Sequence, residues 1–300
     1  MSGDFLGLKT FFTCPYVPAI YTISDNIYPI FLVAICRRIW DEKDMLSLWQ
    51  EVFKPHSKIK RLGQLKGKKH SEAAYLAGRH SRVEEVLRLF RIFIEFLRGT
   101  RALHRIGPAV TVFGSARFNE GHPYYELGLQ VGKALAEAGY TVITGGGPGI
   151  MEAANRGAQA VGGKSIGCTI ALPREQNPNR YLDQVINFYY FFVRKVMLVK
   201  YSYAFIILPG GLGTLDEMSE AITLIQTGKL YDFPVILMGK DYWNGFSNWL
   251  QDTVIQAGAT TKAELHFVHF TDDPQEAVKL IKKATEGIGL NLIALNSTPK

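Results

Sequence analysis

A glycine-rich run followed by an acid has the residue types of a phosphate-binding loop placed beside a carboxylate. The run is PGGLGTLDE, residues 209–217, and it follows an apolar stretch predicted as a strand at 204–208. Gly210, Gly211 and Gly213 allow the backbone to turn tightly and to approach a ligand closely. A helix that begins after them would turn free N–H groups and its positive dipole end toward an anion. The pattern therefore indicates a site for a phosphate group.

Two residues of this run, Thr214 and Glu217, have two interpretations. Their T-x-x-E spacing, at the start of a helix predicted over 214–226, fits a capping box in which two side chains satisfy backbone amides reciprocally. In the other interpretation Thr214 bonds a phosphate oxygen and Glu217 takes part in chemistry, because an acid beside an anion site is unfavourable unless it has a role. The sequence leaves both interpretations open.

Composition indicates a globular protein of a reducing compartment. The 300 residues are 47% hydrophobic, enough for one large domain or two modest ones. The three cysteines, Cys14, Cys36 and Cys168, are far apart and show neither a metal-ligand spacing nor a disulfide framework. The start of the chain lacks a signal-peptide pattern, and the apolar run 28–36 is too short to span a bilayer. We therefore expect a soluble, cytoplasmic protein without a membrane partner.

The net charge of +7 is concentrated in one segment. Residues 53–106 carry fourteen Lys or Arg and four Glu, a net +10, which leaves −3 for the rest of the chain. Such a segment can contact nucleic acid or an acidic partner, but a solvated linker and helix face is the commoner explanation. The segment shows no aromatic interleaving of the kind found in nucleic-acid-binding proteins and no known DNA or RNA motif, so nucleic-acid binding is not expected.

From residue 109 onward, predicted strands and helices alternate. Repeated βα units form a parallel sheet covered by helices on both faces, so the fold class is α/β with a doubly wound, Rossmann-like sheet. Such sheets bind ligands at the carboxyl ends of their strands, where both glycine-rich loops of this chain fall. Strands are predicted at 109–113, 140–144, 165–170, 184–188, 204–208, 234–238 and 266–270, and helices at 124–138, 148–161, 190–200, 214–226, 243–257 and 274–285.

A helical extension precedes this repeat. Residues 82–97 place apolar side chains at i, i+3 and i+4, so this helix is predicted to pack on its own domain or on another subunit. Residues 1–80 form a predicted N-terminal extension of unknown role, and residues 81–300 form the Rossmann-like domain. The apolar positions of the helix are Val83, Val86, Leu87, Phe90, Phe93, Ile94 and Leu97.

Several familiar motifs are absent from the sequence. The second glycine loop, 145–147, has Ile150 where the last glycine of a dinucleotide fingerprint belongs. The stretch 163–165 ends like a P-loop, but Ala158 stands at the position of its first glycine. The chain has no G-x-S-x-G elbow, and its seven histidines show no zinc-type pairing.

Three segments together resemble the LOG ("lonely guy") family: GGGPGIMEAANRGA at 145–158, FFVRKVMLVKYS at 191–202 and PGGLGTLDE at 209–217. Members are cytokinin riboside 5′-monophosphate phosphoribohydrolases and related nucleotide nucleosidases, and the similarity covers roughly residues 109–281. The resemblance implies a Rossmann-like fold, a homodimer or larger oligomer, and no cofactor. Some relatives carry the label lysine decarboxylase, for which no pyridoxal-binding lysine motif is evident in this sequence.

The resemblance also implies which residues form the site. Arg194 and Glu217 are implied as catalytic, and no metal ligand is expected. Ser115 is equally consistent with a plain turn serine, and the aromatic residues 189–192 are interpreted as core or interface residues rather than a base-stacking platform. The expected substrate-binding residues are Ser115, Gly146, Gly147, Gly149, Met151, Lys195, Gly210, Gly211, Gly213 and Thr214.

The residue chemistry agrees with this implication. Arg194 and Glu217 fall on helices that flank the predicted strand 204–208, so both can reach one edge of the sheet. Cleavage of an N-glycosidic bond passes through an oxocarbenium-like sugar, which a carboxylate stabilises while it orients or deprotonates water. Arg194 can grip phosphate or polarise the leaving base. Its alternative interpretation is a surface cation on an otherwise apolar helix.

These observations predict a hydrolase that converts nucleoside 5′-monophosphates, with adenine or a cytokinin-type base, to free base and ribose 5-phosphate. One alternative is a nucleotide- or cofactor-carrying protein on the same fold without turnover, because a fold does not fix function. A second alternative is a regulatory protein that places the basic segment on nucleic acid, and strongly salt-dependent binding would distinguish it.

Overall fold

The structure is a computed structural model. It describes residues 72, 76, 78, 81–171, 177–231 and 233–286. The predicted extension 1–80 therefore lies almost wholly outside the described residues, as do the apolar run 28–36, Cys14 and Cys36.

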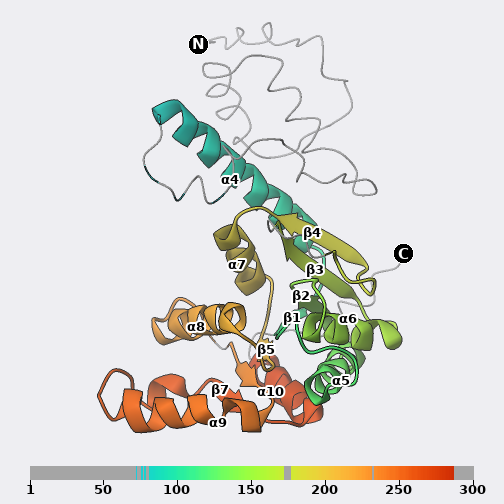
Figure 1. Cartoon of the computed structure of the whole chain (residues 1–300), viewed down its shortest axis with the longest axis vertical. Helices are drawn as coiled ribbons and strands as arrows, with labels where there is room; N and C mark the ends of the chain where they lie inside the picture. Colours follow the sequence, from blue (N-terminus) through green and yellow to red (C-terminus); the bar gives the residue numbers. More distant parts are fainter. Residues whose placement is uncertain are drawn as a thin grey trace, which may run out of the picture. The chain divides into compact units, whose positions relative to one another are not determined.

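The described part of the chain forms one parallel sheet of seven strands, which confirms the α/β, Rossmann-like prediction (Figure 1). The strand order is β4-β3-β2-β1-β5-β6-β7, so the winding direction reverses between β1 and β5. In open sheets of this kind a ligand binds at that reversal, beyond the carboxyl ends of the strands. The strands are β1 Ala109–Phe113, β2 Thr141–Thr144, β3 Ser165–Ile170, β4 Gln184–Phe188, β5 Phe205–Ile207, β6 Val235–Leu237 and β7 Val268–Phe270.

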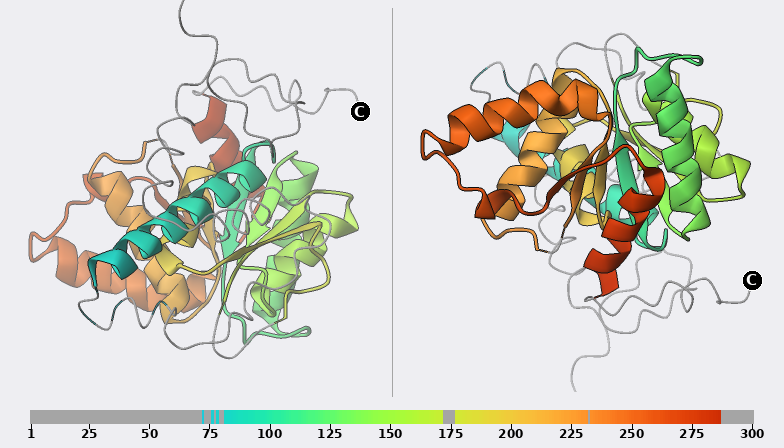
Figure 2. Two further views of the ribbon diagram at one scale, coloured as in Figure 1. Left: turned by 90° about the horizontal axis from the view of Figure 1, so that it is seen from above. Right: turned by 90° about the horizontal axis from the view of Figure 1, so that it is seen from below.

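Helices cover both faces of this sheet (Figure 2). Helices α4, α7 and α8 pack on one face, and α5, α6 and α10 pack on the other. The helices are α4 Arg82–Leu103, α5 Pro123–Glu137, α6 Ile150–Ala160, α7 Phe191–Lys200, α8 Leu212–Gln226, α9 Lys240–Trp249 and α10 Pro274–Glu286, with a π-helical turn at Leu250–Ile255 and a 3₁₀ turn at Ala263–Leu265. None of the described helices is long and apolar enough to cross a membrane.

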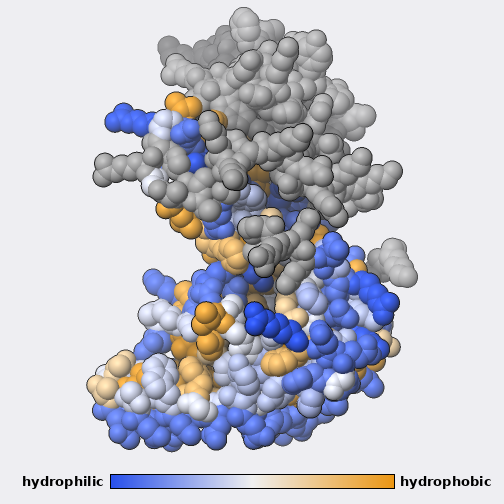
Figure 3. Space-filling view, in the orientation of Figure 1, coloured by the Kyte–Doolittle hydropathy of each residue, from blue (hydrophilic) through white to orange (hydrophobic). Residues whose placement is uncertain are grey.

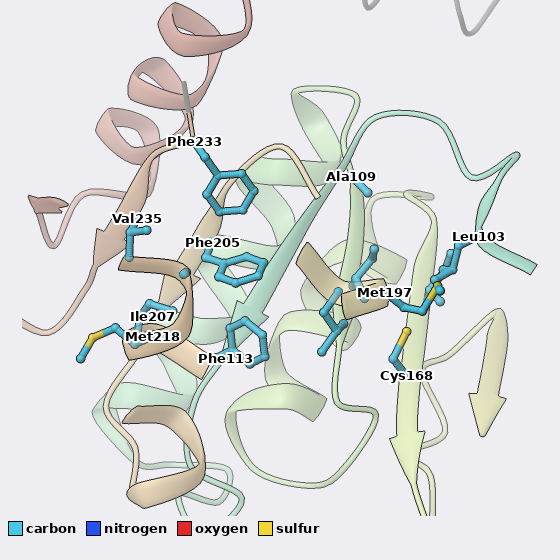
Figure 4. Packing of buried hydrophobic residues seen from close by; sticks show 14 of the residues in the cluster. Leu103, Ala109, Phe113, Cys168, Met197, Phe205, Ile207, Met218, Phe233 and Val235 are labelled. Atoms are coloured by element: carbon cyan, nitrogen blue, oxygen red, sulfur yellow. The ribbon is translucent and has the colours of Figure 1, made fainter. Parts of the chain in front are cut away.

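The core beneath α7 and α8 is dominated by aromatic and aliphatic side chains from neighbouring strands. Phe113 on β1 meets Phe205 on β5 edge to face, with ring centroids 4.9 Å apart, and Phe233 lies 4.9 Å from Phe205 on its other side (Figure 4). Edge-to-face pairs of this kind contribute about 1 kcal/mol beyond their buried area. Met197 of α7 and Met218 of α8 are both buried in this cluster, which fixes the two helices that carry Arg194 and Glu217.

The starts of α6 and α9 differ from the sequence prediction by two and three residues. Helix α6 begins at Ile150, and its N-cap is Gly149 with φ +69°, so Pro148 precedes the helix and the prediction that it forms the first turn is wrong. Helix α9 begins at Lys240 instead of Trp243. The Asp272 carboxylate accepts hydrogen bonds from the N–H groups of Gly239, at 2.7 Å, and Lys240, at 2.9 Å, and starts the helix earlier.

Candidate active site

Three loops meet at the point where the sheet reverses its winding. The Ser115 N–H, after β1, donates to the Pro209 carbonyl of the loop after β5, at 3.0 Å. The Ile150 N–H, at the start of α6, donates to the Ser115 carbonyl, also at 3.0 Å. The carboxyl ends of β1, β2 and β5 are thus tied together by backbone hydrogen bonds, and both glycine loops belong to one site.

The glycines after β5 divide into two kinds. A Cβ at Gly210 would collide with the Thr214 side chain, so this glycine is needed for packing. A Cβ at Gly211 or Gly213 would meet no atom of the described residues within 4 Å. Gly211 has φ −84°, which any residue can adopt, so its backbone imposes no need for glycine. These two glycines leave open space directly in front of a helix N-terminus.

The capping-box interpretation of Thr214 and Glu217 is wrong. Helix α8 begins at Leu212, two residues before the predicted start, and its N-cap is Gly211, which has no side chain to cap with. Thr214 is therefore the third helical residue, and Glu217 lies more than one turn inside the helix. Glu217 is only 5% exposed, so burial of a carboxylate there requires another explanation.

Arg194 supplies that explanation. Its Nη1 lies 3.5 Å from Glu217 Oε1, and the two side chains are 11% and 6% exposed. The Arg194 Nε donates to the Cys168 carbonyl at 2.8 Å, which orients the guanidinium. A buried, oriented arginine is not a surface cation, so that alternative is excluded. The structure brings together the two residues implied as catalytic.

Burial raises the pKa of Glu217 to about 7, while the positive charges of Arg194 and Lys195 oppose the shift. A carboxyl group with this pKa exchanges its proton near neutral pH, as groups that act in acid–base chemistry do. Burial also raises the pKa of the Cys168 thiol to about 12, with Arg194 opposing, so this thiol stays protonated. Cys168 therefore contributes its carbonyl and not its sulfur.

Lys195 points to α8 and ties two helices together. Its Nζ lies 3.0 Å from Asp216 Oδ1 and 2.7 Å from Glu220 Oε2, on either side of Glu217 in sequence. The structure thus gives Lys195 carboxylate partners on α8, and they hold the helix that carries Glu217 against α7.

In the loop after β2, Gly145 lies close to the Arg194 side chain of the Arg194–Glu217 pair. A Cβ at Gly145 would lie 2.7 Å from Met151 Sδ and 3.0 Å from Arg194 Nη2. Met151 and Arg194, expected at the site from sequence, therefore both lie beside this glycine. Gly146 adopts φ +73°, a conformation that favours glycine, and its N–H donates to Thr144 Oγ1 at 2.9 Å.

Asn179 fixes the loop after β2 by hydrogen bonds, and the sequence analysis did not identify it. Its N–H donates to the Gly146 carbonyl at 2.9 Å, and its Nδ2 donates to the Gly147 carbonyl at 3.0 Å and to Asn155 Oδ1 at 2.9 Å. Asn155 is fully buried and also accepts from Thr144 Oγ1 at 2.7 Å. Gly146 and Gly147 therefore have their conformation fixed by a satisfied polar network.

Two further side chains position the loops. The Ser115 Oγ accepts from the Arg117 N–H at 3.1 Å, which is the turn role that the sequence left open for this serine. The Tyr242 hydroxyl, on α9, donates to the Gly210 carbonyl at 2.9 Å and fixes the glycine loop after β5. Tyr242 was also not identified from the sequence, because its partner lies 32 residues away.

The aromatic residues at the start of α7 do not act as one group. Tyr190 is buried in the core, whereas Phe191 and Phe192 are 42% and 38% exposed. Within the residues that the structure describes, no group of three or more His, Cys, Asp or Glu side chains is placed to hold a metal ion.

Comparison with known proteins finds a matching family model and several similar proteins. A family model described as possible lysine decarboxylase matches residues 151–281. A cytokinin riboside 5′-monophosphate phosphoribohydrolase of Mycobacterium tuberculosis is 29% identical over 160 residues, covering 51% of this chain and 83% of that protein. A pyrimidine/purine nucleotide 5′-monophosphate nucleosidase of Escherichia coli K12 is 27% identical over 216 residues, covering 67% of this chain and 46% of that protein.

Among solved structures, a molybdenum cofactor binding protein from the phototrophic bacterium Rippkaea orientalis is 27% identical, with a TM-score of 0.44, covering 59% of this chain and 96% of that one. Arg194 and Glu217 both lie within the residues that the family model matches. Residues 151–281 thus match the family described as possible lysine decarboxylase, and the chain is similar to cytokinin riboside 5′-monophosphate phosphoribohydrolases of the LOG family.

Proposed function

We propose that this protein hydrolyses the N-glycosidic bond of nucleoside 5′-monophosphates, releasing the base and ribose 5-phosphate. The observation that carries the proposal is the buried Arg194–Glu217 pair, 3.5 Å apart, at the edge of the sheet where an uncapped helix N-terminus faces open space. The helix N-terminus suits the 5′-phosphate, and the carboxylate suits the sugar carbon that becomes positive.

The reaction needs little beyond these groups. Free N–H groups at the start of α8, near Gly211 and Gly213, bind the phosphate and fix the ribose beside Glu217. The ionised Glu217 carboxylate stabilises the oxocarbenium-like sugar and orients the water that adds to it. The oxygen of that water ends on the sugar carbon, and a proton ends on the departing base. Arg194 favours the ionised form of Glu217 and presents its remaining N–H groups to the substrate.

The relatives support this class of substrate. Those from Mycobacterium tuberculosis and Escherichia coli are both named for nucleoside or nucleotide 5′-monophosphates. An adenine or cytokinin-type base is the preference that we propose for this chain. A panel of nucleoside 5′-monophosphates with free-base detection tests it, and we expect AMP or its N6-modified forms to be cleaved fastest. Tight binding of the same nucleotides with no base released would favour a carrier protein instead.

Filling the open space at Gly211 should block substrate binding without unfolding the protein. Gly211→Val places a branched side chain where no described atom lies within 4 Å, at a backbone conformation that valine tolerates. We expect KM for AMP to rise at least about 10-fold through lost phosphate contacts, with little change in melting temperature. Gly245→Ala, in α9 and equally open, is the matched control and should change neither quantity. An unchanged KM in the valine variant would contradict the proposal that this loop binds the 5′-phosphate.

The pH dependence of kcat/KM should show a limb near pH 7 that belongs to Glu217. Burial raises the pKa of Glu217 to about 7, and the ionised carboxylate is the active form, so activity rises as the pH increases through this value. The substrate phosphate, with its second pKa at about 6, adds a separate limb common to all variants. Arg194→Ala should move the Glu217 limb to higher pH, because the opposing charge is lost. A wild-type profile without a limb near pH 7 would contradict the assigned role.

We also propose that the protein is a homo-oligomer that uses α4. This helix exposes a stripe of apolar side chains, and Figure 3 shows some apolar atoms beside polar ones where α4 is not covered by grey atoms. Phe93→Asp should dissociate the oligomer without unfolding the chain, because Phe93 is already 39% exposed. Val161→Asp, 37% exposed at the end of α6, is the control. Light scattering that finds wild-type monomers at micromolar concentration would contradict the proposal. The exposed residues of the stripe are Val83, Val86, Leu89, Phe93 and Leu97.

A further inference from the structure

The start of α7, the helix that carries Arg194, is held by carboxylates from the segment before β1. Glu95 Oε1, on α4, accepts hydrogen bonds from the backbone N–H groups of Tyr189, at 2.7 Å, and Tyr190, at 3.1 Å. Glu72 Oε1 accepts from the next N–H group, that of Phe191, at 3.2 Å. Three consecutive donors at a helix start are thus satisfied by acids that lie about a hundred residues earlier in the chain.

These bonds are favourable for two physical reasons. The first N–H groups of a helix have no partner within it, and the helix dipole makes this end positive. Hydrogen bonds to an ionised carboxylate are roughly twice as strong as those between neutral groups. The start of α7 is therefore occupied by protein acids, in contrast to the start of α8, where Gly211 leaves the N-terminus open.

Close packing connects the same two helices. Gly99, one turn after Glu95 on α4, is buried, and a Cβ added there would lie 3.0 Å from Phe188 and 3.1 Å from Met197 of α7. The first turn of α7 leads directly to Arg194, whose own N–H donates to the Tyr190 carbonyl at 3.2 Å. Tyr190 thus lies between Glu95 and Arg194 in an unbroken series of hydrogen bonds.

We propose that Glu95 is a positioning residue for Arg194: by fixing the backbone at Tyr189 and Tyr190, it sets the distance between the Arg194 guanidinium and Glu217. The inference rests on the proposed function only for its effect on turnover. Glu95 lies outside the residues 151–281 that the family model matches, so α4 contributes to the site from outside the matched domain.

The test compares Glu95→Ala, which removes the acceptor, with Glu95→Gln, whose amide oxygen still accepts both hydrogen bonds. Glu85→Ala is the matched control on the same helix. The readout is the pKa of Glu217, followed by carbon-13 NMR of glutamate carboxyl groups and assigned with Glu217→Gln. We expect Glu95→Ala to raise this pKa by about 1, because Arg194 moves away. Glu95→Gln and Glu85→Ala should leave it near the wild-type value.

The direction in which the pKa of Glu217 changes in Glu95→Ala decides whether Glu95 positions Arg194. Removing a negative charge at position 95 by itself would lower the pKa of Glu217. A rise therefore indicates that the cations of α7 that lower this pKa, Arg194 first and Lys195 second, have moved away from the carboxylate. Amide hydrogen exchange at Tyr189 and Tyr190 should accelerate at least about 10-fold in Glu95→Ala alone. If that variant fails to fold, Glu95→Asp, with a shorter reach, replaces it in the same comparison.

Turnover is a separate readout. If the protein cleaves AMP, Glu95→Ala should lower kcat/KM about 10-fold and Glu95→Gln should restore it. A Glu217 pKa in Glu95→Ala that equals or falls below the wild-type value would overturn the positioning role. Absence of turnover in the wild-type protein would instead contradict the proposed function, and it would leave the NMR comparison intact because that needs no substrate.

Discussion

Glu217→Gln is expected to reduce the release of base from AMP at least about 100-fold. Glutamine keeps the size and much of the hydrogen bonding of the side chain, but it cannot carry the negative charge that stabilises the sugar cation. The change is measured as initial rates of adenine release at saturating AMP. Asp216→Asn is the control, because Asp216 is the adjacent acid with a 59% exposed side chain and pairs with Lys195. It should retain most of the activity.

The melting temperature of Glu217→Gln distinguishes a catalytic role of Glu217 from a purely structural one. Loss of a helix cap costs about 1 kcal/mol, but Glu217 caps nothing in this structure. Because burial raises its pKa above the ordinary value, the stabilising contribution of its protonated form is complete below about pH 4.5 and lost as the pH rises through about 7. At pH 8, Glu217→Gln loses only the ion pair with Arg194. We therefore expect its melting temperature at this pH to fall by no more than the loss of that one ion pair explains. If Glu217→Gln melts at a lower temperature than the wild-type protein but hydrolyses AMP at the normal rate, the role of Glu217 is structural and not catalytic.

Removal of the 5′-phosphate is the second large effect. Adenosine should be cleaved roughly 1000-fold more slowly than AMP, as measured by kcat/KM, because two or more hydrogen bonds to a charged phosphate contribute about 1.5–3 kcal/mol each. Those bonds come from N–H groups at the start of α8, where Gly211 and Gly213 leave room. Ribose 5-phosphate should inhibit AMP hydrolysis competitively, whereas ribose should not. Equal turnover of adenosine and AMP would show that no phosphate site operates in this loop.

The parallel sheet was predictable from sequence because its signals are local. Apolar runs of four to six residues alternate with amphipathic stretches, and such βα repeats have few alternatives to a doubly wound sheet. The structure confirms each predicted strand to within two residues at either end. The pairing of Arg194 with Glu217 was also accessible, because both residues belong to short motifs that flank β5.

Other parts of the site depend on contacts that local patterns do not contain. Helix α8 begins at Leu212 and not at the predicted Thr214, because its N-cap is Gly211 and the Thr214 side chain does not cap it. Tyr242 and Asn179 position the glycine loops from 32 residues away in each case. Glu95 reaches the start of α7 across 94 residues. Nothing in the types or spacing of these residues marks them, and only the folded chain brings them to their partners.

The central claim is tested most directly by the products that the wild-type protein forms from AMP. The purified protein and its Glu217→Gln variant are each incubated with AMP, and the products are separated and identified by mass spectrometry. We expect adenine and ribose 5-phosphate in equal amounts from the wild-type protein and almost none from the variant. Adenosine and inorganic phosphate as products, or AMP recovered intact after binding, would contradict the assignment of Arg194 and Glu217 to cleavage of the N-glycosidic bond.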